Sequence, residues 1–320
     1  MDTVRKAVIT AAGKGTRQYP ASTTVQKEML PLVDVDGITK PTIQIICEEA
    51  LNSGIEEICV ITNPEVDEQM RRHFRPIRPE MMASFAGKEW ALQQSEKLED
   101  LRSRLHFIIQ EAPEGYGHAV YQARSFVGDE PFLLLLGDHV YVSRSNKPCS
   151  RQMIDVFQTS GCTVSAVAPT PQDLLHLFGA VAGKRIATDP NIYDVEVIQE
   201  KPSIEFAEEN MRVEGLHRGY YLCFFGMHLF THGIFDALEH NIRNNIREKG
   251  EFQLTSAQEL LRQRERYVAF ETRGDRYDMG VPFGFVETQM GLALNSPFRD
   301  QVLASLIRSL AKNVPSDVLA

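Results

Sequence analysis

Cysteine and tryptophan are both scarce in this 320-residue sequence, which has five cysteines and one tryptophan. The cysteines stand far apart and form no Cys-x-x-Cys pair, which argues against a disulfide framework and against a structural zinc site. We expect five reduced thiols, most of them buried. The nine histidines show no HExxH motif or other close ligand spacing, so a catalytic zinc is not expected either.

Long apolar runs and an excess of positive charge are also missing. The longest apolar runs, at residues 132–136 and 221–230, are too short to span a bilayer, and the charged first six residues do not resemble a secretory signal. We therefore expect a soluble cytoplasmic protein that does not bind membranes. Because acidic residues outnumber basic ones by 43 to 34, a broad nucleic-acid-binding surface is not expected. A local cluster of Lys and Arg could still bind a small anion.

Strand-like and helix-like segments alternate along the first part of the chain. Buried strands are predicted at residues 6–11, 58–62, 105–109 and 132–136. Helices are predicted between them at residues 42–52, 65–74 and 116–126. This alternation indicates right-handed βαβ crossovers and a mainly parallel sheet. Less regular strands are predicted at residues 163–168, 180–182, 195–199 and 220–226, and these should extend the sheet by mixed or antiparallel pairing.

The whole pattern predicts one α/β domain over residues 1–295, Rossmann-like, with three layers and helices on both faces of a mixed, mainly parallel sheet. The polar, Met- and charge-rich stretch 75–104 is interpreted as a partly helical insertion. Further helices are expected at 251–264 and 283–294. Residues 296–320 are expected to form a C-terminal helical tail whose amphipathic part packs on the body or contacts another subunit, as in a homodimer or homotetramer.

A glycine-rich turn follows the first expected strand, with the sequence Ala11-Ala12-Gly13-Lys14-Gly15-Thr16-Arg17. Open α/β sheets bind ligands beyond the carboxyl ends of their strands, and backbone N–H groups of such a turn can cradle phosphate oxygens. Lys14 and Arg17 add positive charge there. The turn is neither a dinucleotide fingerprint, which needs a third glycine where Gln18 stands, nor a Walker A loop. Taken alone, it could equally be a structural turn.

The residues after this turn are more specific. The segment continues to Lys27-Glu28-Met29-Leu30-Pro31, and the two parts together resemble the signature of sugar-1-phosphate nucleotidyltransferases, most closely the bacterial UTP–glucose-1-phosphate uridylyltransferases. The resemblance implies the fold of that family, Mg²⁺ as cofactor, and Arg17 and Lys27 as catalytic cations. It also implies a set of nucleotide-binding residues, namely Ala11, Ala12, Gly13, Lys14, Gly15, Thr16 and Glu28.

The segment Gly115-Tyr116-Gly117-His118-Ala119, preceded by Gln110, resembles the element of this family that faces the nucleobase. The resemblance implies that Gln110 and Gly115 bind the nucleotide, and the Gln amide offers a donor and an acceptor to a uracil edge. A flexible turn before a helix is the alternative interpretation of the two glycines. We interpret His118 as a capping or packing residue rather than a proton donor.

Two aspartates resemble the metal ligands of the family. Asp138 follows a buried strand in Gly137-Asp138-His139, where the family has Gly-Asp-Asp, and Asp278 stands in a Tyr-Asp-x-Gly segment. Two carboxylates suit Mg²⁺, which also keeps water and phosphate oxygens as ligands. Alone, Asp138 could be a helix cap or turn former. His139 departs from the family pattern and puts any role of the missing carboxylate in doubt.

Four further segments resemble the sugar-phosphate site. In Glu200-Lys201-Pro202, the resemblance implies that Glu200 binds sugar hydroxyls and that Lys201 acts as a catalytic cation on the sugar phosphate. Gly179 and, more loosely, Gly226 match glycines that let backbone approach the sugar. Residues 251–255 match the rim of the sugar pocket. Without the family context, the segment 200–202 would be interpreted as a surface turn.

These matches imply uridylyl transfer from UTP to glucose 1-phosphate, giving UDP-glucose and pyrophosphate. The sugar phosphate attacks the α-phosphorus in line, and catalysis consists of positioning and charge neutralisation. One alternative is another nucleotide, such as dTTP, or another hexose 1-phosphate, because uracil and thymine differ by one methyl group. A second is a non-catalytic regulatory subunit that binds nucleotide sugars, which His139 and the atypical loop 18–26 would favour.

Overall fold

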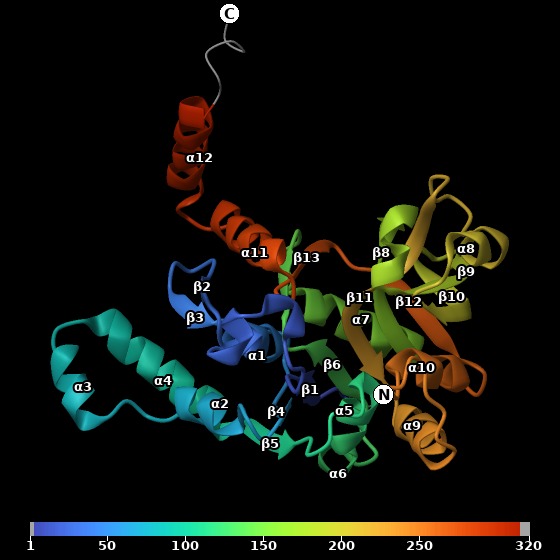
Figure 1. Cartoon of the computed structure of the whole chain (residues 1–320), viewed down its shortest axis with the longest axis horizontal. Helices are drawn as coiled ribbons and strands as arrows, with labels where there is room; N and C mark the ends of the chain where they lie inside the picture. Colours follow the sequence, from blue (N-terminus) through green and yellow to red (C-terminus); the bar gives the residue numbers. More distant parts are fainter. Residues whose placement is uncertain (1–2, 314–320) are drawn as a thin grey trace, which may run out of the picture.

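The computed structural model describes residues 3–313, which are built around one nine-stranded sheet (Figure 1). The strand order is β5-β4-β1-β6-β11-β8-β12-β10-β9. The first four strands are parallel, as the alternation of strands and helices predicted. Their bounds are β1 Lys6–Thr10, β4 Glu57–Thr62, β5 Leu105–Ile109 and β6 Phe132–Leu136.

The second half of the sheet is mixed, which confirms the expected change of pairing. The strand β11 runs antiparallel to β6 and β8, β12 is parallel to β8, and β10 is antiparallel to β12 and β9. β9 also pairs with β11, so this end of the sheet curls back on itself. The bounds are β8 Thr163–Pro171, β9 Gly179–Ile186, β10 Asp189–Glu200, β11 Tyr220–Phe230 and β12 Tyr267–Glu271.

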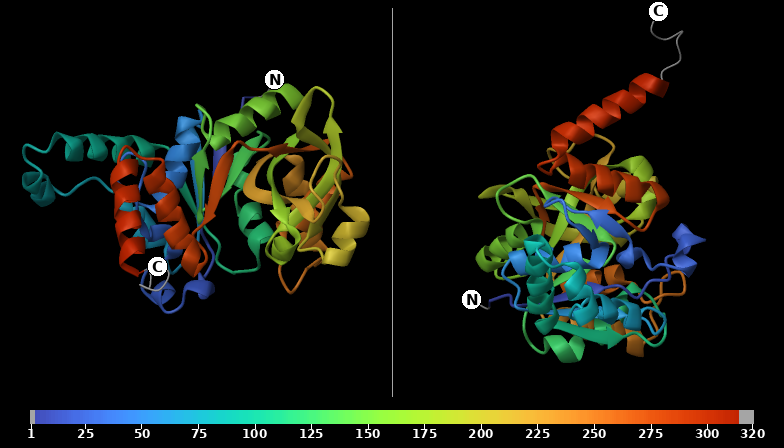
Figure 2. Two further views of the ribbon diagram at one scale, coloured as in Figure 1. Left: turned by 90° about the horizontal axis from the view of Figure 1, so that it is seen from above. Right: turned by 90° about the vertical axis from the view of Figure 1, so that its left-hand side faces the viewer.

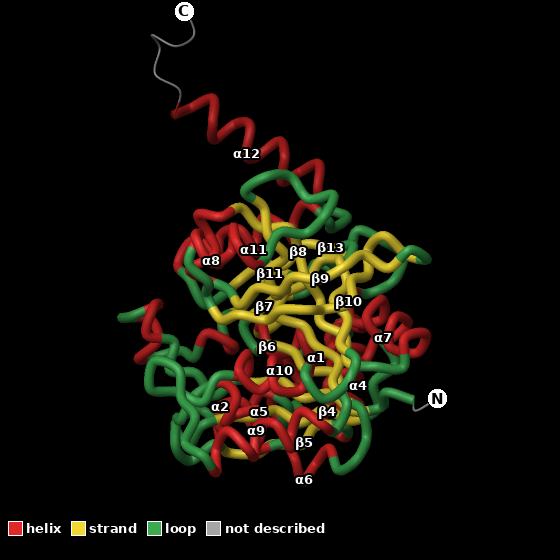
Figure 3. Tube along the Cα trace, turned by 90° about the vertical axis from the view of Figure 1, so that its right-hand side faces the viewer, coloured by secondary structure: helices red, strands yellow, loops and turns green. Residues whose placement is uncertain are grey.

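Helices cover both faces of the sheet, so the predicted three-layer α/β fold is confirmed (Figures 1 and 3). Side chains alternate between the two cores along each strand; Leu134 of β6 points into one core and Leu135 into the other. One core is covered by α5 Tyr116–Gln122, α6 Arg124–Val127, α8 Ile204–Asn210, α9 Gly233–Arg243 and α10 Leu254–Arg262. The other is covered by α1 Thr42–Asn52, α2 Asp67–His73 and α7 Cys149–Ser160. All five cysteines are buried and unpaired, as expected.

One predicted helix is divided in two. The segment expected as a single helix over 116–126 has a break at Ala123, which ends α5 and precedes α6. Two small two-stranded sheets were not predicted. They pair β2 Pro31–Val33 with β3 Thr39–Pro41, and β7 His139–Ser143 with β13 Gly274–Asp278.

Two helical extensions leave the body of the molecule (Figure 2). One consists of α3 Pro79–Ser84 and α4 Glu89–Ser103, within the stretch interpreted as an insertion. The other is α12 Arg299–Asn313, which points away from the sheet (Figures 1 and 3). It follows α11 Pro282–Leu294, which packs on the body against β13, β7 and β2. The rest of the expected tail, 314–320, lies outside the described residues. Over residues 3–313, no helix combines the length and apolar character that crossing a membrane requires.

Candidate active site

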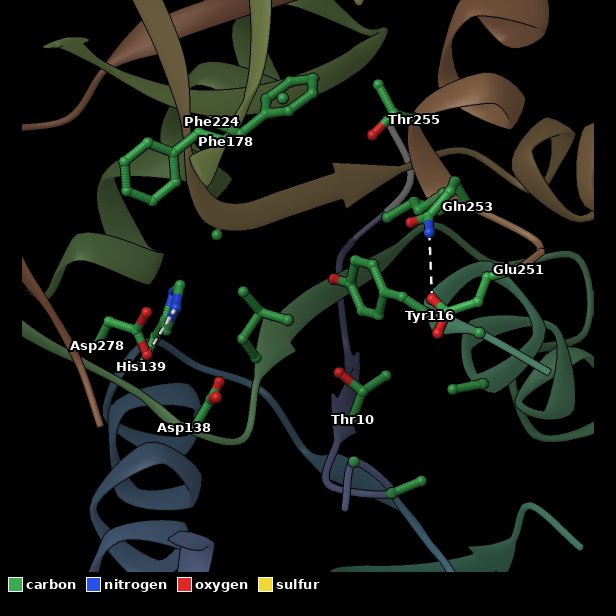
Figure 4. Close-up of a pocket in the computed structure, with 18 of the residues that line it drawn as sticks. Thr10, Tyr116, Asp138, His139, Phe178, Phe224, Glu251, Gln253, Thr255 and Asp278 are labelled. Carbon is green, nitrogen blue, oxygen red and sulfur yellow. Dashed lines mark hydrogen bonds and ion pairs between the residues drawn. The ribbon is translucent and has the colours of Figure 1, made fainter. Parts of the chain in front are cut away.

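A cavity of about 810 Å³ lies beyond the carboxyl ends of β1 and β6, and most of the residues singled out from the sequence line it. Figure 4 shows Asp138, His139 and Asp278 gathered at one end of it, away from Glu251 and Gln253. The structure thus brings together segments that are far apart in the chain. The predicted site residues that line the cavity are Ala12, Gly13, Lys14, Thr16, Arg17, Lys27, Glu28, Gln110, Gly115, Asp138, Gly179, Glu200, Lys201, Gly226 and Asp278.

Ala11 and Gly15 are the predicted nucleotide-binding residues that do not line this cavity. Ala11 is completely buried, and its backbone N–H donates to the carbonyl of Ile61 in β4. Gly15 has a φ of +61°, a left-handed conformation that glycine adopts without strain, and it begins the short 3₁₀ helix Thr16–Gln18. Both residues shape the glycine loop and do not contribute to the wall of the cavity.

The glycine loop folds around the side chain of Lys27, which lies in the 3₁₀ helix Lys27–Met29. A Cβ atom on Gly13 would lie 3.5 Å from Lys27 Nζ, and Gln26 fastens the loop by donating to the Gly13 carbonyl at 2.6 Å. Lys27 Nζ lies 2.6 Å from Asp138 Oδ2. Burial alone would lower the pKa of the Lys27 ammonium, but the Asp138 carboxylate outweighs it and the pKa is raised. Lys27 is thus a fixed positive charge at the cavity wall.

Glu28 is the buried neighbour of this lysine, with 1% of its surface exposed. Burial raises the pKa of its carboxyl to about 8, although Lys27, with Nζ 3.7 Å from Glu28 Oε1, lowers it. Among the described residues, Glu28 Oε2 has no hydrogen-bond partner. A carboxyl that keeps its proton at neutral pH can donate a hydrogen bond into the cavity.

The pairing of β7 with β13 explains how two distant aspartates meet. Its register places Asp278 opposite His139, the residue after Asp138. A Cβ atom on Gly280 would lie 2.7 Å from Asp138 Oδ2 and 2.8 Å from Asp278 Oδ1, so both carboxylates face one small space. Burial alone would raise the pKa of Asp138, but Lys27 outweighs it and the pKa is lowered. Two carboxylates facing one space are suited to a divalent cation.

Arg17 and Arg276 add positive charge next to these carboxylates. Arg17, with 57% of its side chain exposed, has Nη1 3.9 Å from Asp278 Oδ2. Arg276 is two residues before Asp278 on β13, so both side chains leave the same face of the strand. It donates from Nη1 to the Phe224 carbonyl and lies over the Phe178 ring at 4.3 Å. Arg276 was not predicted to belong to the site, although its spacing of two residues from Asp278 on a strand places both side chains on one face.

The predicted sugar-phosphate residues line another part of the cavity wall. Glu200, at the end of β10, accepts a hydrogen bond from Thr255 Oγ1 at 2.6 Å, which fixes its carboxylate. Lys201 follows with a φ of +43°, and its Nζ lies 3.5 Å from Glu200 Oε1. A Cβ atom on Gly179 would lie 2.8 Å from the Phe224 ring and 3.1 Å from Glu200 Oε2. Glycine at this position therefore keeps the space beside Glu200 open.

Gln110 is buried at the end of β5, and the start of α5 sets its orientation. Its Nε2 atom lies 2.9 Å from His118 Nδ1 and 3.3 Å from the carbonyl of Gly115. This leaves Oε1 as an acceptor. His118 also contacts Gln122, so it links Gln110 to α5. His118 lies at the start of the helix, as predicted, but its contact with Gln110 was not predicted, because that contact depends on how the loop folds.

The glycine at 115 has a packing role in addition to its place at the cavity. Its φ is +117°, and a Cβ atom there would lie 2.8 Å from the carbonyl oxygen of Phe252. Gly117 approaches the same carbonyl and donates its N–H to it at 2.8 Å. The two glycines thus bring α5 against the segment 251–253, which was expected at the rim of the site and lines the cavity through Glu251 and Gln253.

Comparison with known proteins is consistent with this geometry. Residues 6–294 match the family described as Nucleotidyl transferase. The chain belongs to this family. It is 38% identical to the UTP–glucose-1-phosphate uridylyltransferase of Streptococcus pneumoniae over 97% of both chains, and 38% identical to that of Streptococcus pyogenes over 98% of this chain and 96% of the relative. The UTP-bound UGPase of Acinetobacter baumannii has a similar structure, with a TM-score of 0.78 and 25% identity over 96% of this chain and all of the other.

As a nucleotidyl transferase, the chain is an enzyme that transfers a nucleotidyl group. Its cavity has positive side chains from separate segments of the chain. They are Lys14 and Arg17 in the glycine loop, Lys27 after it, Lys201 after β10, and Arg276 on β13 of the small β7–β13 sheet. Carboxylates stand between them. Such an arrangement is suited to neutralising phosphate charge at several points, as transfer of a nucleotidyl group requires.

Proposed function

We propose that this nucleotidyl transferase moves a uridylyl group from UTP to glucose 1-phosphate, giving UDP-glucose and pyrophosphate. The streptococcal relatives, similar along nearly the whole chain, are named for UTP and glucose 1-phosphate. The observation that carries the proposal is the convergence of Asp138 and Asp278 on one space, with Lys27 and Arg17 beside them. Transfer at an α-phosphorus needs charge neutralised at such a point.

In an in-line displacement, the carboxylates of this site would hold the metal ion, and its cations would pair with the phosphates. Asp138 and Asp278 would hold Mg²⁺, whose charge neutralises phosphate oxygens. Lys27 neutralises the triphosphate, and Arg17 with Lys14 stabilises the leaving pyrophosphate. Since a sugar phosphate dianion is already a nucleophile near neutral pH, the step needs no general base. The enzyme supplies position and charge.

The nucleotide base is read by Gln110. Because Nε2 is engaged by His118 and the Gly115 carbonyl, Oε1 is presented as an acceptor, and the N3–H of uracil is the matching donor. Cytosine has no proton at N3, so this contact favours UTP over CTP. Thymine has the same N3–H, which makes dTTP the competitor that the contact alone does not reject.

The sugar phosphate is proposed to bind on the other side of the cavity. Glu200, fixed by Thr255, accepts hydrogen bonds from sugar hydroxyls, and Lys201 pairs with the phosphate. Gly179 keeps the space next to Glu200 open for the sugar ring. Gly226 lines the cavity beside His139, and its backbone approaches the sugar from there.

We also propose a cytoplasmic homodimer or homotetramer. The helix α12 extends from the body with Ile307 and Leu310 exposed by 64% and 67%, and a second copy of the chain would cover such side chains (Figure 2). Light scattering on the full chain and on the Ile307→Asp variant tests the oligomeric state. The wild type should be a dimer or tetramer and the variant should dissociate, whereas a monomeric wild type would reject the proposal.

The function is tested by pyrophosphate release with Mg²⁺ and glucose 1-phosphate, offering UTP, dTTP, ATP, CTP and GTP in parallel. Wild type should release pyrophosphate with UTP, and Asp138→Asn, which removes one carboxylate charge, should not. Preference for dTTP would overturn the base assignment and keep the chemistry. Binding of UDP-glucose without release from any nucleotide would indicate a regulatory subunit instead.

A further inference from the structure

His139 stands beside the two carboxylates that the proposed function assigns to the metal. Its Nε2 atom lies 3.8 Å from Asp278 Oδ1, and one donor atom from each of Asp138, His139 and Asp278 lies within 4.8 Å of the others (Figure 4). Ligands about 2.1 Å from a six-coordinate ion are about 3.0 Å apart when adjacent and about 4.2 Å apart when opposite. The observed Nε2–Oδ1 separation lies below the spacing of opposite ligands, and the three donor atoms reach one ion after side-chain movements of up to about 0.6 Å.

The imidazole ring of His139 is buried, and one of its nitrogens lacks a hydrogen-bond partner among the described residues. Its side chain is 9% exposed, and Nδ1 has no hydrogen-bond partner among residues 3–313. Gly226, with a φ of +85°, presses its backbone against the ring, and a Cβ atom there would lie 2.4 Å from Nδ1. A buried polar nitrogen without a partner destabilises the folded chain. Nε2 is therefore the ring nitrogen that faces Asp278, and Nδ1, which carries the proton when Nε2 binds a metal ion, lies against the backbone of Gly226.

We propose that His139 is a third protein ligand of the divalent cation, through Nε2, and that the site therefore favours Mn²⁺ over Mg²⁺. The inference rests on the proposed function, which places the cation between Asp138 and Asp278. Where the family pattern has a second aspartate, this chain replaces an oxygen donor by a nitrogen donor. Imidazole binds transition-metal ions, whereas Mg²⁺ prefers oxygen, and Mn²⁺ accepts both.

The test is pulsed EPR of Mn²⁺ bound to the full chain in the presence of UTP. Wild type should show the ¹⁴N coupling of a directly bound imidazole, and protein grown with [¹⁵N]histidine should show the ¹⁵N pattern, which assigns the nitrogen without a mutation. His139→Asp should lose the coupling and lower the ratio of Mn²⁺ to Mg²⁺ affinity about tenfold. His139→Asn, uncharged, serves if the extra carboxylate disturbs folding. His106→Asn, at an exposed histidine on β5, is the control and should keep the coupling.

The outcomes separate this inference from the proposed function. A wild type without a histidine coupling overturns the inference, and so does a coupling that persists in His139→Asp. Pyrophosphate release is measured on the same samples. Turnover without the histidine coupling rejects the inference alone, whereas the coupling without turnover of any nucleotide rejects the proposed function alone.

Discussion

Replacing Gly280 by alanine places a methyl group where the charged groups of the site converge. The new Cβ would lie 2.7 Å from Asp138 Oδ2, 2.8 Å from Asp278 Oδ1 and 2.8 Å from Arg17 Nη2. Each separation is at least about 0.7 Å shorter than the roughly 3.5 Å at which non-bonded atoms rest, so all three groups must move. The backbone of Gly280 is outside the left-handed region, so alanine fits without conformational strain.

The expected result is a loss of activity without a matching loss of stability. Displacing catalytic groups by this much costs about 10²-fold in kcat. Steady-state pyrophosphate release and thermal unfolding are measured together, with Gly161→Ala as the control. Gly161 ends α7 with a φ of +65° and open space around it, so alanine there should cost about 1 kcal/mol of stability and leave kcat unchanged. A Gly280→Ala enzyme with kcat within about threefold of wild type would show that the charged groups keep their working positions, which contradicts the expected displacement.

Three further variants test individual contacts. Lys27→Met removes the charge 2.6 Å from Asp138 and should lower kcat by about 10²–10³-fold in the pyrophosphate assay; a change below about tenfold would contradict its role. Burial raises the pKa of the Glu28 carboxyl to about 8, so between pH 4.5 and 8 the folded state keeps a proton that the unfolded chain releases. The free energy of unfolding should therefore fall over this range by up to about 1.4 kcal/mol per pH unit. Glu28→Gln should remove this contribution to the pH dependence measured by urea unfolding, and an identical pH dependence in both proteins would disprove the raised pKa. His118→Phe frees the Gln110 amide and should reduce the preference for UTP over CTP about tenfold, seen in kcat/KM, while thermal unfolding changes little; an unchanged preference would refute the orienting role.

The strands of the first half could be predicted from sequence because each is a short apolar run between polar turns. The predicted limits of 105–109 and 132–136 agree with β5 and β6, and those of 42–52 with α1. The helix α7, Cys149–Ser160, was not predicted from the sequence, although Pro148 precedes it and Gly161 ends it. Its buried positions include Ser150 and Gln152, so its hydrophobic pattern is interrupted on the buried face.

The sequence predicted which residues belong to the candidate site, but it did not predict the contacts among them. Motifs identified Asp138 and Asp278 separately, but their convergence depends on the β7–β13 pair, which no local pattern predicted. The roles of His118 and Arg276 depend on partners brought close by folding, Gln110 and Phe178. A sequence pattern shows which side chains are available, while the register of distant strands decides which of them meet.

We propose that the transfer is a single in-line displacement, in which the protein supplies position and charge and forms no covalent intermediate. The most direct test is the stereochemical course at phosphorus, using UTP with a chiral α-phosphorothioate and glucose 1-phosphate. A single displacement predicts inversion of configuration in the UDP-glucose analogue. Retention would contradict a single displacement, because it requires two displacements and a uridylylated protein side chain.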